Sequence, residues 1–476
     1  MQYKSIIGGG MLLLFSSTLT GQHALSLDET LLLTQQQNHT LLLAKKGIEW
    51  NVAERDRLRS FWYPNINASG AYTYLSNDIE VKESLSQITD PAKDFIHSIV
   101  PDEQFISSIL DKIGQHSLTF GLMPNNLTTI DANMMWTVFA GGKRIHASRI
   151  GSRLVDISRV EHQQVDATLQ TEVVTSYFAV RLGTQVVQVR QRAYDDLLKH
   201  YEYALKMEQN GILNKADRLF AQVTMEESKR TLTTAKKELY VAQQALNRVV
   251  NLDSTQQIEP TTPLFINAKI PTASYFKAQL PTANFTVNKL AMQEKIAHNQ
   301  LQIDRAAYLP NIALWAKQTM YSNGIPSNLV PRSMVGVAFT WNLFDGLERE
   351  KRIRQTKIAA QMVTLTKQKA VDDLSLAVDN FYAQLENALT DVASLQASIA
   401  LGNELVRMRK RAFLEGMGTS IEVIDAEVMR ANVHIASLAA YYAYDVALIN
   451  LLAVCGLTDT FAQYRASGAW EAHLQE

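Results

Sequence analysis

The residue types that usually carry out chemistry are sparse in this sequence and form no catalytic pattern. The chain has 476 residues, a single cysteine (Cys455) and ten histidines without metal-ligand spacing. It contains no phosphate-binding glycine loop, no His-Glu-x-x-His zinc motif and no nucleophile elbow. One thiol excludes an intrachain disulfide and a multi-cysteine zinc cluster, and its apolar surroundings indicate a buried, inert side chain. We therefore expect no catalysis, no cofactor and no metal.

Composition and the N-terminus narrow the class of protein further. A net charge of −1 with 46% hydrophobic residues is globular and gives no electrostatic case for nucleic-acid binding. Residues 1–24 place Lys4 before an apolar run from Ile6 to Leu19, which indicates a secretory signal peptide cleaved between Gly21 and Ser26. An ordinary buried helix is the alternative. No cysteine lies at the start of the mature chain, so we expect no lipid anchor there.

The mature chain offers no second long apolar run free of charge. The nearest run, 439–452, contains Asp445 and Asn450. We therefore expect no membrane-spanning helix after the signal peptide, and any crossing of a membrane must use a closed β-barrel.

The sequence is internally repeated. WTVFAGGKR at 136–144 matches WNLFDGLER at 341–349, and the same offset of 205 residues aligns Gly211 with Gly416. YPNINASG at 63–70 matches LPNIALWA at 309–316 with an offset of 246, so the first copy carries an insertion within 78–128. We expect repeat 1 at 25–252, an equatorial linker at 253–285, repeat 2 at 286–457 and a C-terminal tail at 458–476. Proline density in the linker is expected to stop helices.

Each repeat predicts a long helical hairpin. Neither 143–210 nor 347–415 contains proline, and a heptad seam of apolar residues runs from Leu374 to Val406. Such runs give helices of about 100 Å. Glycine turns at Gly211 and at Gly416 and Gly418 precede return helices at 216–250 and 420–455. A cytoskeletal or adaptor coiled coil would show the same pattern.

Two strands precede each long helix. Residues 66–75, 129–139, 312–317 and 335–343 alternate apolar and polar side chains, which predicts β-strands. Strands of this kind are typical of outer-membrane barrels, although a small soluble sheet is the alternative. Four strands cannot close a barrel, so the chain must oligomerise or the sheet must bury its apolar face elsewhere. The strand-to-helix motif places an interfacial tryptophan before a glycine that permits the turn; its residues are Trp136, Phe139, Gly141, Gly142, Trp341, Phe344 and Gly346.

With these elements in place, the chain resembles the TolC-like outer membrane factor (outer membrane efflux protein) family. The resemblance rests on the signal peptide, the two YPN/LPN–strand–strand–WxxFxG–helix units and the segment LEGMGTSIEVIDAEVMRANVHIASLAAYYAYDVALINLLAVCGL. It implies a mainly α fold with a β-barrel part, in which a homotrimer forms a twelve-stranded barrel in outer-membrane lipid and an α-barrel through the periplasm.

The resemblance also implies a function. Such a channel exports small molecules or polypeptides, including type I secretion, together with an inner-membrane transporter and a periplasmic adaptor. The alternative is a periplasmic coiled-coil structural or adaptor protein with a small β-domain. The cargo and the particular partners are not specified by the sequence.

The resemblance implies site residues at the hairpin tips. Glu422, Asp425 and Phe413 match the periplasmic gate and pore, and the acids could alternatively be helix N-terminal residues stabilised by the dipole. The adaptor-docking turns are Gly211, Leu213, Gly416, Gly418 and Thr419. Phe413 lacks the hydroxyl of the family's aromatic tip residue, and Gly418 lacks its basic side chain. Closure is therefore expected to use other contacts, with Arg409, Lys410 and Arg411 as candidates.

The insertion has a helical pattern of its own. Phe95 and Ile99, then Phe105, Ile109 and Ile113, fall at helical spacing interrupted by Pro101. This predicts a short helical hairpin outside the cell that caps or narrows the mouth of the barrel. A disordered loop is the alternative.

Overall fold

The computed structural model describes residues 22–99, 104–253, 256–324, 330–466 and 470–472. All but the last three positions of the expected signal peptide lie outside the described residues. The chain forms two compact units. Unit 1 comprises Met1–Val52, Arg153–Lys295 and Gln361–Glu476, and unit 2 comprises Ala53–Ser152 and Ile296–Ala360. Each unit combines segments from both halves of the chain.

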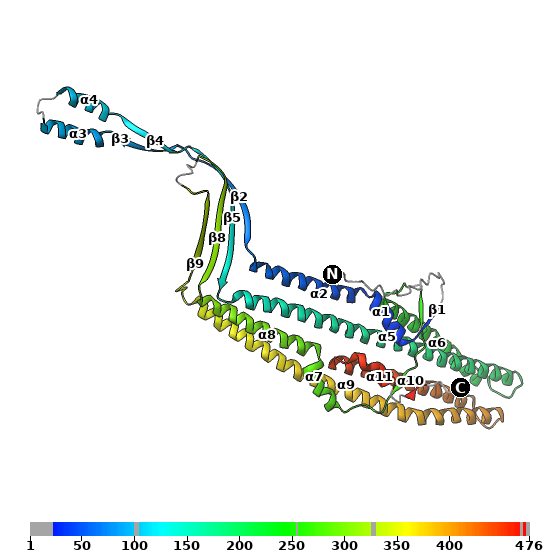
Figure 1. Cartoon of the computed structure of the whole chain (residues 1–476). Coiled ribbons are helices and arrows are strands. Elements are labelled where there is room, and N and C mark those ends of the chain that lie inside the picture. The colour runs from blue at the N-terminus through cyan, green and yellow to red at the C-terminus, as the bar shows by residue number, and fades with distance from the viewer. Residues whose placement is uncertain (1–21, 100–103, 254–255, 325–329, 467–469, 473–476) are drawn as a thin grey trace, which may run out of the picture. The chain divides into compact units, whose positions relative to one another are not determined.

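Helices dominate the fold, and Figure 1 labels most of them. Their bounds are α1 Leu27–Gln37, α2 His39–Arg59, α3 Ser86–Ile99, α4 Gln104–Gly114, α5 Lys143–Gln209, α6 Lys215–Val250, α7 Ala273–Ala283, α8 Phe285–Arg305, α9 Glu348–Leu414, α10 Ser420–Cys455 and α11 Phe461–Ala466. The strands are β1 Gln22–Leu25, β2 Asn65–Tyr74, β3 Ile79–Ser84, β4 Ser117–Met123, β5 Asn126–Ala140, β6 Gln257–Pro260, β7 Phe265–Ile266, β8 Asn311–Asn323, β9 Ser333–Thr340 and β10 Trp470–Glu471.

The predicted long helices are confirmed. α5 and α9 each contain 67 residues, which at 1.5 Å per residue makes them about 100 Å long. The return helices α6 and α10 contain 36 residues each. Asn214 caps the first turn of α6 with its side chain, and Thr419 forms a capping box with Glu422 at the start of α10.

Unit 2 contains the predicted four-stranded sheet, in the order β2-β5-β8-β9 with every pair antiparallel. β2 and β9 are its edges, so the sheet of one chain is open. The fourth strand is shorter than predicted: β9 ends at Thr340, and Trp341 and Leu343 follow it outside the ladder. In the first repeat, by contrast, Trp136 remains inside β5.

The two faces of the sheet differ in chemistry. One face is polar: Asn133 Nδ2 donates to Ser69 Oγ at 2.9 Å, and Lys317 Nζ lies 2.8 Å from Asp131 Oδ2. The other face exposes large apolar side chains in this single chain. These exposed side chains include Ile66, Tyr72, Val335, Val337 and Phe339. The period of two along each strand produces this separation.

The insertion between β2 and β5 is an ordered arm. β3 and β4 pair into an antiparallel ribbon, and α3 and α4 pack against each other beyond it. Figure 1 shows the arm continuing from the end of the β2–β5 pair. The predicted helical hairpin is confirmed, whereas the ribbon was missed although Ile79 and Val81 in β3 and Leu118 and Phe120 in β4 alternate with polar residues, because each run is only six or seven residues long. The inserted segment also ends earlier than 128, since β5 begins at Asn126.

The segment 253–285 contains more structure than its prolines suggest. α7 includes Pro281, whose missing N–H costs one helical hydrogen bond only two residues before the helix ends. β6 pairs in parallel with β1 near the N-terminus, and β7 pairs with β10 near the C-terminus. This segment therefore joins both ends of the described chain to the middle of unit 1.

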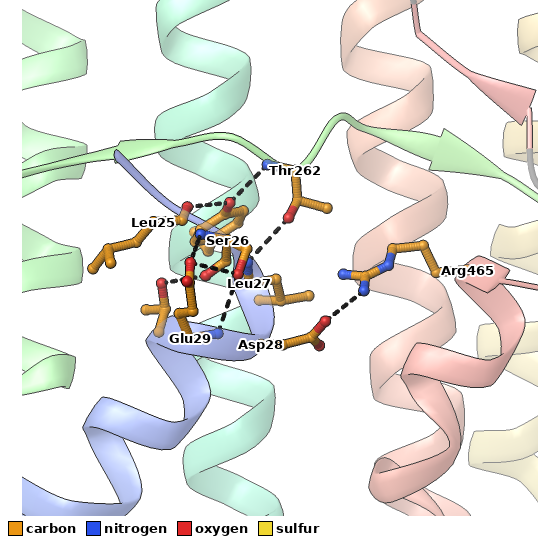
Figure 2. A network of polar contacts seen from close by, with 9 residues as sticks. Leu25, Ser26, Leu27, Asp28, Glu29, Thr262 and Arg465 are labelled. Atoms are coloured by element: carbon orange, nitrogen blue, oxygen red, sulfur yellow. Dashed lines mark hydrogen bonds and ion pairs between the residues drawn. The ribbon is translucent and has the colours of Figure 1, made fainter. Parts of the chain in front are cut away.

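Polar contacts reinforce this junction, and Figure 2 shows them from close by. The Tyr177 hydroxyl donates to the Leu25 carbonyl at 2.8 Å and accepts from the Thr262 N–H at 2.9 Å. Arg465 lies 2.6 Å from the carboxylate of Asp28. Segments more than 200 residues apart in the sequence are thereby held together.

α10 provides much of the core of unit 1. By length and composition it could cross a membrane, but 61% of its most apolar window is buried inside the protein. Tyr444 and Leu448 are fully buried there together with Phe265 from β7. Cys455 is also buried, as predicted, and burial raises the pKa of its thiol to about 12.

Candidate functional site

The two long hairpins of unit 1 end in glycine turns of the same kind. Gly211 and Gly416 have φ values of +70° and +74°, a left-handed conformation that costs other residues roughly 1–2 kcal/mol. The next residue in each turn donates its N–H back to the preceding helix, Ile212 at 2.8 Å and Met417 at 2.9 Å. Both turns are therefore defined by the backbone.

Two exposed apolar side chains lie at these turns beside the residues expected to form the docking surface. Ile212 and Met417 are more than two-thirds exposed, at 71% and 75%. Leu213 is instead half-buried and packs against a small cluster that includes Ile424, while the Thr419 side chain caps α10. Ile212 and Met417 each come directly after the turn glycine, and this position is the sequence signal that could have identified them.

Gly418 has little room for a side chain. A Cβ at this position would lie 3.1 Å from the Phe413 nitrogen and 3.2 Å from Ala412 Cβ. The Gly418 N–H also donates to the Ala412 carbonyl at 3.1 Å. A side chain at this position would require its neighbours to shift by a few tenths of an ångström.

Glu422 and Asp425 lie in the first turns of α10 but differ in their partners. Glu422 closes the capping box with Thr419 and lies 3.1 Å from Arg409 on α9. Asp425 is exposed and, within the described part of the chain, forms no ion pair. Of the two carboxylates, Asp425 therefore presents the less compensated negative charge, and Glu422 also fits the helix-capping alternative.

Phe413 is a packing residue rather than an exposed one. It is 5% exposed, and its ring centroid lies 4.8 Å from that of His200 on α5. His200 Nε2 shares a hydrogen bond of 2.8 Å with Ser420 Oγ. Burial, reinforced by the nearby charge of Lys410, lowers the pKa of His200 to about 4. A neutral imidazole thus joins α5 to both helices of the second hairpin.

A network of four charged residues connects the same three helices. Glu427 on α10 is 1% exposed and lies 2.5 Å from Lys410 on α9 and 2.7 Å from Arg430. Arg430 in turn lies 2.7 Å from Asp196 on α5, and Lys410 lies 3.7 Å from the same carboxylate. We call Asp196, Lys410, Glu427 and Arg430 the tip clamp. Glu427 is the buried member, whereas the side chains of Lys410 and Arg430 remain 40% and 25% exposed. Removing either cation therefore leaves a buried carboxylate with less compensation, which is destabilising.

Of the basic residues singled out from the sequence, two contact acids on α10. Arg409 reaches Glu422 and Lys410 reaches Glu427, whereas among the described residues Arg411 pairs with Glu415, the first residue after α9. Asp196, Glu427 and Arg430 were missed. The sequence signal was weak, because alternating charges on a helix usually lie on a solvated face.

The strand-to-helix motif makes equivalent contacts in both repeats. Trp136 Nε1–H donates to the Trp62 carbonyl at 3.0 Å, and Trp341 Nε1–H donates to the Tyr308 carbonyl at 3.1 Å. A guanidinium stacks over each of these acceptor residues, Arg144 at 5.4 Å and Arg349 at 4.7 Å from the ring centroid. In each repeat the motif thus links the residues at the end of the second strand to the residues just before the first strand.

Glycines make the turn from strand to helix possible. Gly141, Gly142 and Gly346 all have positive φ. At Gly141 a Cβ would also lie 2.6 Å from the Ala306 carbonyl oxygen, so only glycine fits. Phe139 and Phe344 are exposed.

The match to a known protein family covers the same two repeats. The profile of the family described as outer membrane efflux protein matches residues 31–252 and 279–457. The chain belongs to the outer membrane efflux protein family. It is accordingly an outer-membrane channel-tunnel that extends into the periplasm, not an enzyme. No curated protein matches the sequence of this efflux protein.

Solved structures show the same fold at low sequence identity. CusC, whose transmembrane channel formation has been described, has a TM-score of 0.72 and 15% identity over 96% of this chain and 98% of CusC. The outer membrane protein VceC from Vibrio cholerae has a TM-score of 0.69 and 13% identity over 90% of this chain and 96% of VceC. The outer membrane channel MtrE from Neisseria gonorrhoeae has a TM-score of 0.67 and 16% identity over 91% of this chain and 89% of MtrE.

The polar face of the efflux protein's sheet carries a hollow of ≈ 860 Å³ near its helical end. Asn67, Asn133 and Lys317 line it beside the aromatic ring of Trp315. Trp315 lies against Gly336 on the neighbouring strand, where a Cβ would be 2.8 Å from the indole. The hollow therefore combines hydrogen-bonding groups, a cation and a flat aromatic surface.

Proposed function

We propose that three copies of this chain form one continuous export conduit. The observation that supports it is the open sheet, with two free edge strands and a face of exposed apolar side chains. Four strands per copy would give a twelve-stranded barrel, which buries the apolar face in outer-membrane lipid and joins β9 of one copy to β2 of the next. The homotrimer also turns the polar face, with Asp131 and Lys317, toward the aqueous lumen.

In this proposal the division of the chain follows its repeats. Residues 25–252 and 286–457 each contribute two strands and one long hairpin, the segment 253–285 is the equatorial linker, and residues 458–476 form the tail. The segment 1–24 directs export of the chain and is removed. Long hairpins from three copies would supply six antiparallel pairs for the wall of the periplasmic tunnel.

The conduit has no chemistry of its own and would take its energy from a partner. We infer that an inner-membrane transporter supplies small molecules or polypeptides from the periplasmic side and that a periplasmic adaptor links the two proteins. The adaptor would dock on the turns at Gly211, Leu213, Gly416, Gly418 and Thr419. The exposed side chains of Ile212 and Met417 would supply the apolar contact area there.

The periplasmic gate would be formed by the second hairpin. Threefold symmetry would arrange Glu422 and Asp425 as two rings of carboxylates, which favour cations. Phe413 would support the gate by packing against His200, and the tip clamp would hold the second hairpin against α5 when the gate is closed.

A matched pair of substitutions tests the barrel. Val337 lies on the apolar face of β9, and its neighbour Ala338 lies on the polar face. A lysine on the lipid face near the bilayer centre costs about 2–4 kcal/mol, whereas a lumen residue tolerates it. We expect Val337→Lys to prevent assembly in the outer membrane and Ala338→Lys to permit it. Native mass measurement in detergent should give three copies for the wild type. A soluble monomer from the periplasm would refute the proposal.

A further inference from the structure

The inserted arm carries an apolar surface that nothing in a single chain covers. Large side chains on the outer faces of α3 and α4 are exposed. We call Ile88, Phe95, Phe105, Ile106, Ile109 and Ile113 the arm stripe. It is distinct from the contact between the two helices, where Thr89 is buried beneath Gly114 and a Cβ at Gly114 would lie 2.6 Å from Thr89 Oγ1. The hairpin is thus already packed internally and still exposes six large apolar side chains.

The charge of the hairpin argues against a lipid surface as the occupant. Residues 86–114 contain five acids and two lysines. Lys93 pairs with Asp90 at 3.0 Å and also with Asp111, so one of the two cations is already neutralised. Amphipathic helices that lie on membranes carry a polar face rich in lysine and arginine. An acidic hairpin would be repelled by an anionic lipid surface.

The position where the arm joins the sheet instead favours neighbouring copies of the chain as the occupant. β2 leads directly into the ribbon, and β2 is an edge of the sheet. In the proposed trimer this edge is the seam with β9 of the next copy, so every arm begins beside another copy. The inference therefore rests on the proposed function.

The arm is long enough to reach its counterparts. β3 has six residues and α3 has fourteen, which corresponds to about 20 Å for each element. Twelve strands spaced about 4.8 Å apart and tilted by about 40° give a barrel roughly 24 Å across. Its axis is then about 12 Å from the wall, well within the length of each arm.

We propose that the arm stripes of the three copies pack against one another above the barrel mouth and form a six-helix cap. The cap buries the exposed isoleucines and phenylalanines, leaves the acidic faces in water and closes the outer end of the conduit. In this proposal the conduit has a second constriction, formed by unit 2, in addition to the gate formed by unit 1.

Cysteine cross-linking of the full-length protein in outer membranes tests this contact. Phe95→Cys and Ile109→Cys place a thiol on the stripe, while His97→Cys and Ser108→Cys place one on exposed faces of the same helices. The native Cys455 is buried, so it should not compete with the introduced thiols. With an oxidant we expect disulfide-linked dimers from the two stripe variants at ten times or more the yield from the two controls.

Each other outcome has a defined meaning. Equal or absent cross-linking from the stripe variants, in protein that is still trimeric, would overturn the cap but leave the conduit intact. Reaction of the stripe thiols with a lipid-partitioning maleimide in intact cells would show that lipid covers the stripe, which also overturns the cap. A wild-type chain that is not trimeric would instead refute the proposed function itself.

A second measurement addresses closure of the mouth. Replacing 79–123 by a short turn should leave the trimer intact and raise the open-channel conductance in a planar bilayer at least twofold. Unchanged conductance would show that the arms do not obstruct the pore.

Discussion

Trp136 and Trp341 make the same hydrogen bond in the two halves of the chain. Each indole N–H donates to the carbonyl of the residue two positions before a Pro-Asn pair, Trp62 in one repeat and Tyr308 in the other, at 3.0 and 3.1 Å. The two repeats therefore share side-chain contacts as well as a sequence motif. Both hydrogen bonds hold the residues that follow α2 or α8 against the segment where the chain turns from the sheet into the long helix.

Removing one of these donors should weaken the junction measurably. Trp341→Phe keeps the apolar ring but leaves the Tyr308 carbonyl without its partner, which costs about 0.5–1.5 kcal/mol. We expect the thermal midpoint of the purified protein in detergent to fall by about 1–3 °C. Phe344→Leu, at an exposed position of the same motif, is the control. If both variants melt together with the wild type, the hydrogen bond does not contribute to stability.

The two acids of the gate should contribute unequally to ion selectivity. Glu422 lies 3.1 Å from Arg409, whereas Asp425 is exposed without such a partner among the described residues. We expect Asp425→Asn to reduce cation preference more than Glu422→Gln, as measured by the reversal potential in a KCl gradient. A larger effect from Glu422→Gln would place Asp425 outside the pore.

The tip clamp should hold the channel closed. Glu427→Gln leaves Lys410 and Arg430 without their buried carboxylate, and we expect a several-fold rise in open probability in planar bilayers. Adding Lys410→Met should partly restore closure, because removing both members of a buried pair leaves less uncompensated charge than removing one. Glu415→Gln, which breaks only the exposed pair with Arg411, should have no effect. Closed channels from Glu427→Gln would contradict the clamp.

A buried acid should make stability depend on pH. Asp445 is fully buried in unit 1, and burial raises the pKa of its carboxyl well above the ordinary value. The folded state then keeps the proton while the unfolded chain loses it, so stability falls as pH rises above about 4 and until the folded pKa is reached. We expect Asp445→Asn to raise the thermal midpoint at pH 8 and to change little at pH 4.

The matched control for this prediction is Asp425→Asn. Asp425 is exposed on the same helix, so its variant, which keeps Asp445, should show the same change in thermal midpoint between pH 4 and pH 8 as the wild type. Circular dichroism of both variants in detergent across this range is the measurement. An Asp445→Asn protein that is less stable than the wild type at pH 8 would mean that the carboxylate is ionised and required.

The long helices and the four main strands could be predicted because their signals are periodic and local. Proline-free heptad spacing defines α9, and alternation defines β2 and β5 over ten residues or more. The end of a strand has a weaker sequence signal. β9 stops before Trp341, because the motif there turns toward Tyr308 instead of extending the ladder. Periodicity does not encode that turn.

The tip clamp could not be predicted for a different reason. Glu427 is buried by contacts with Lys410, seventeen residues away, and its network includes Asp196, more than 200 residues away. A charge on an amphipathic helix ordinarily faces water, so only tertiary packing distinguishes it. The same limit applies to β1 and β10, each too short to show a pattern before its partner is known.

The pairing of β1 with β6 bears on how the chain acquires its structure. The N–H of Leu27 reaches Thr262, 235 residues further along, so the first described strand has no partner until more than half of the polypeptide has emerged. Contacts this distant in sequence slow folding, since loop-closure entropy is lost before they form. β1 at the start of unit 1 must therefore stay unpaired while the rest of the chain is exported. We expect it to be the segment most exposed to proteases and most dependent on chaperones in the periplasm.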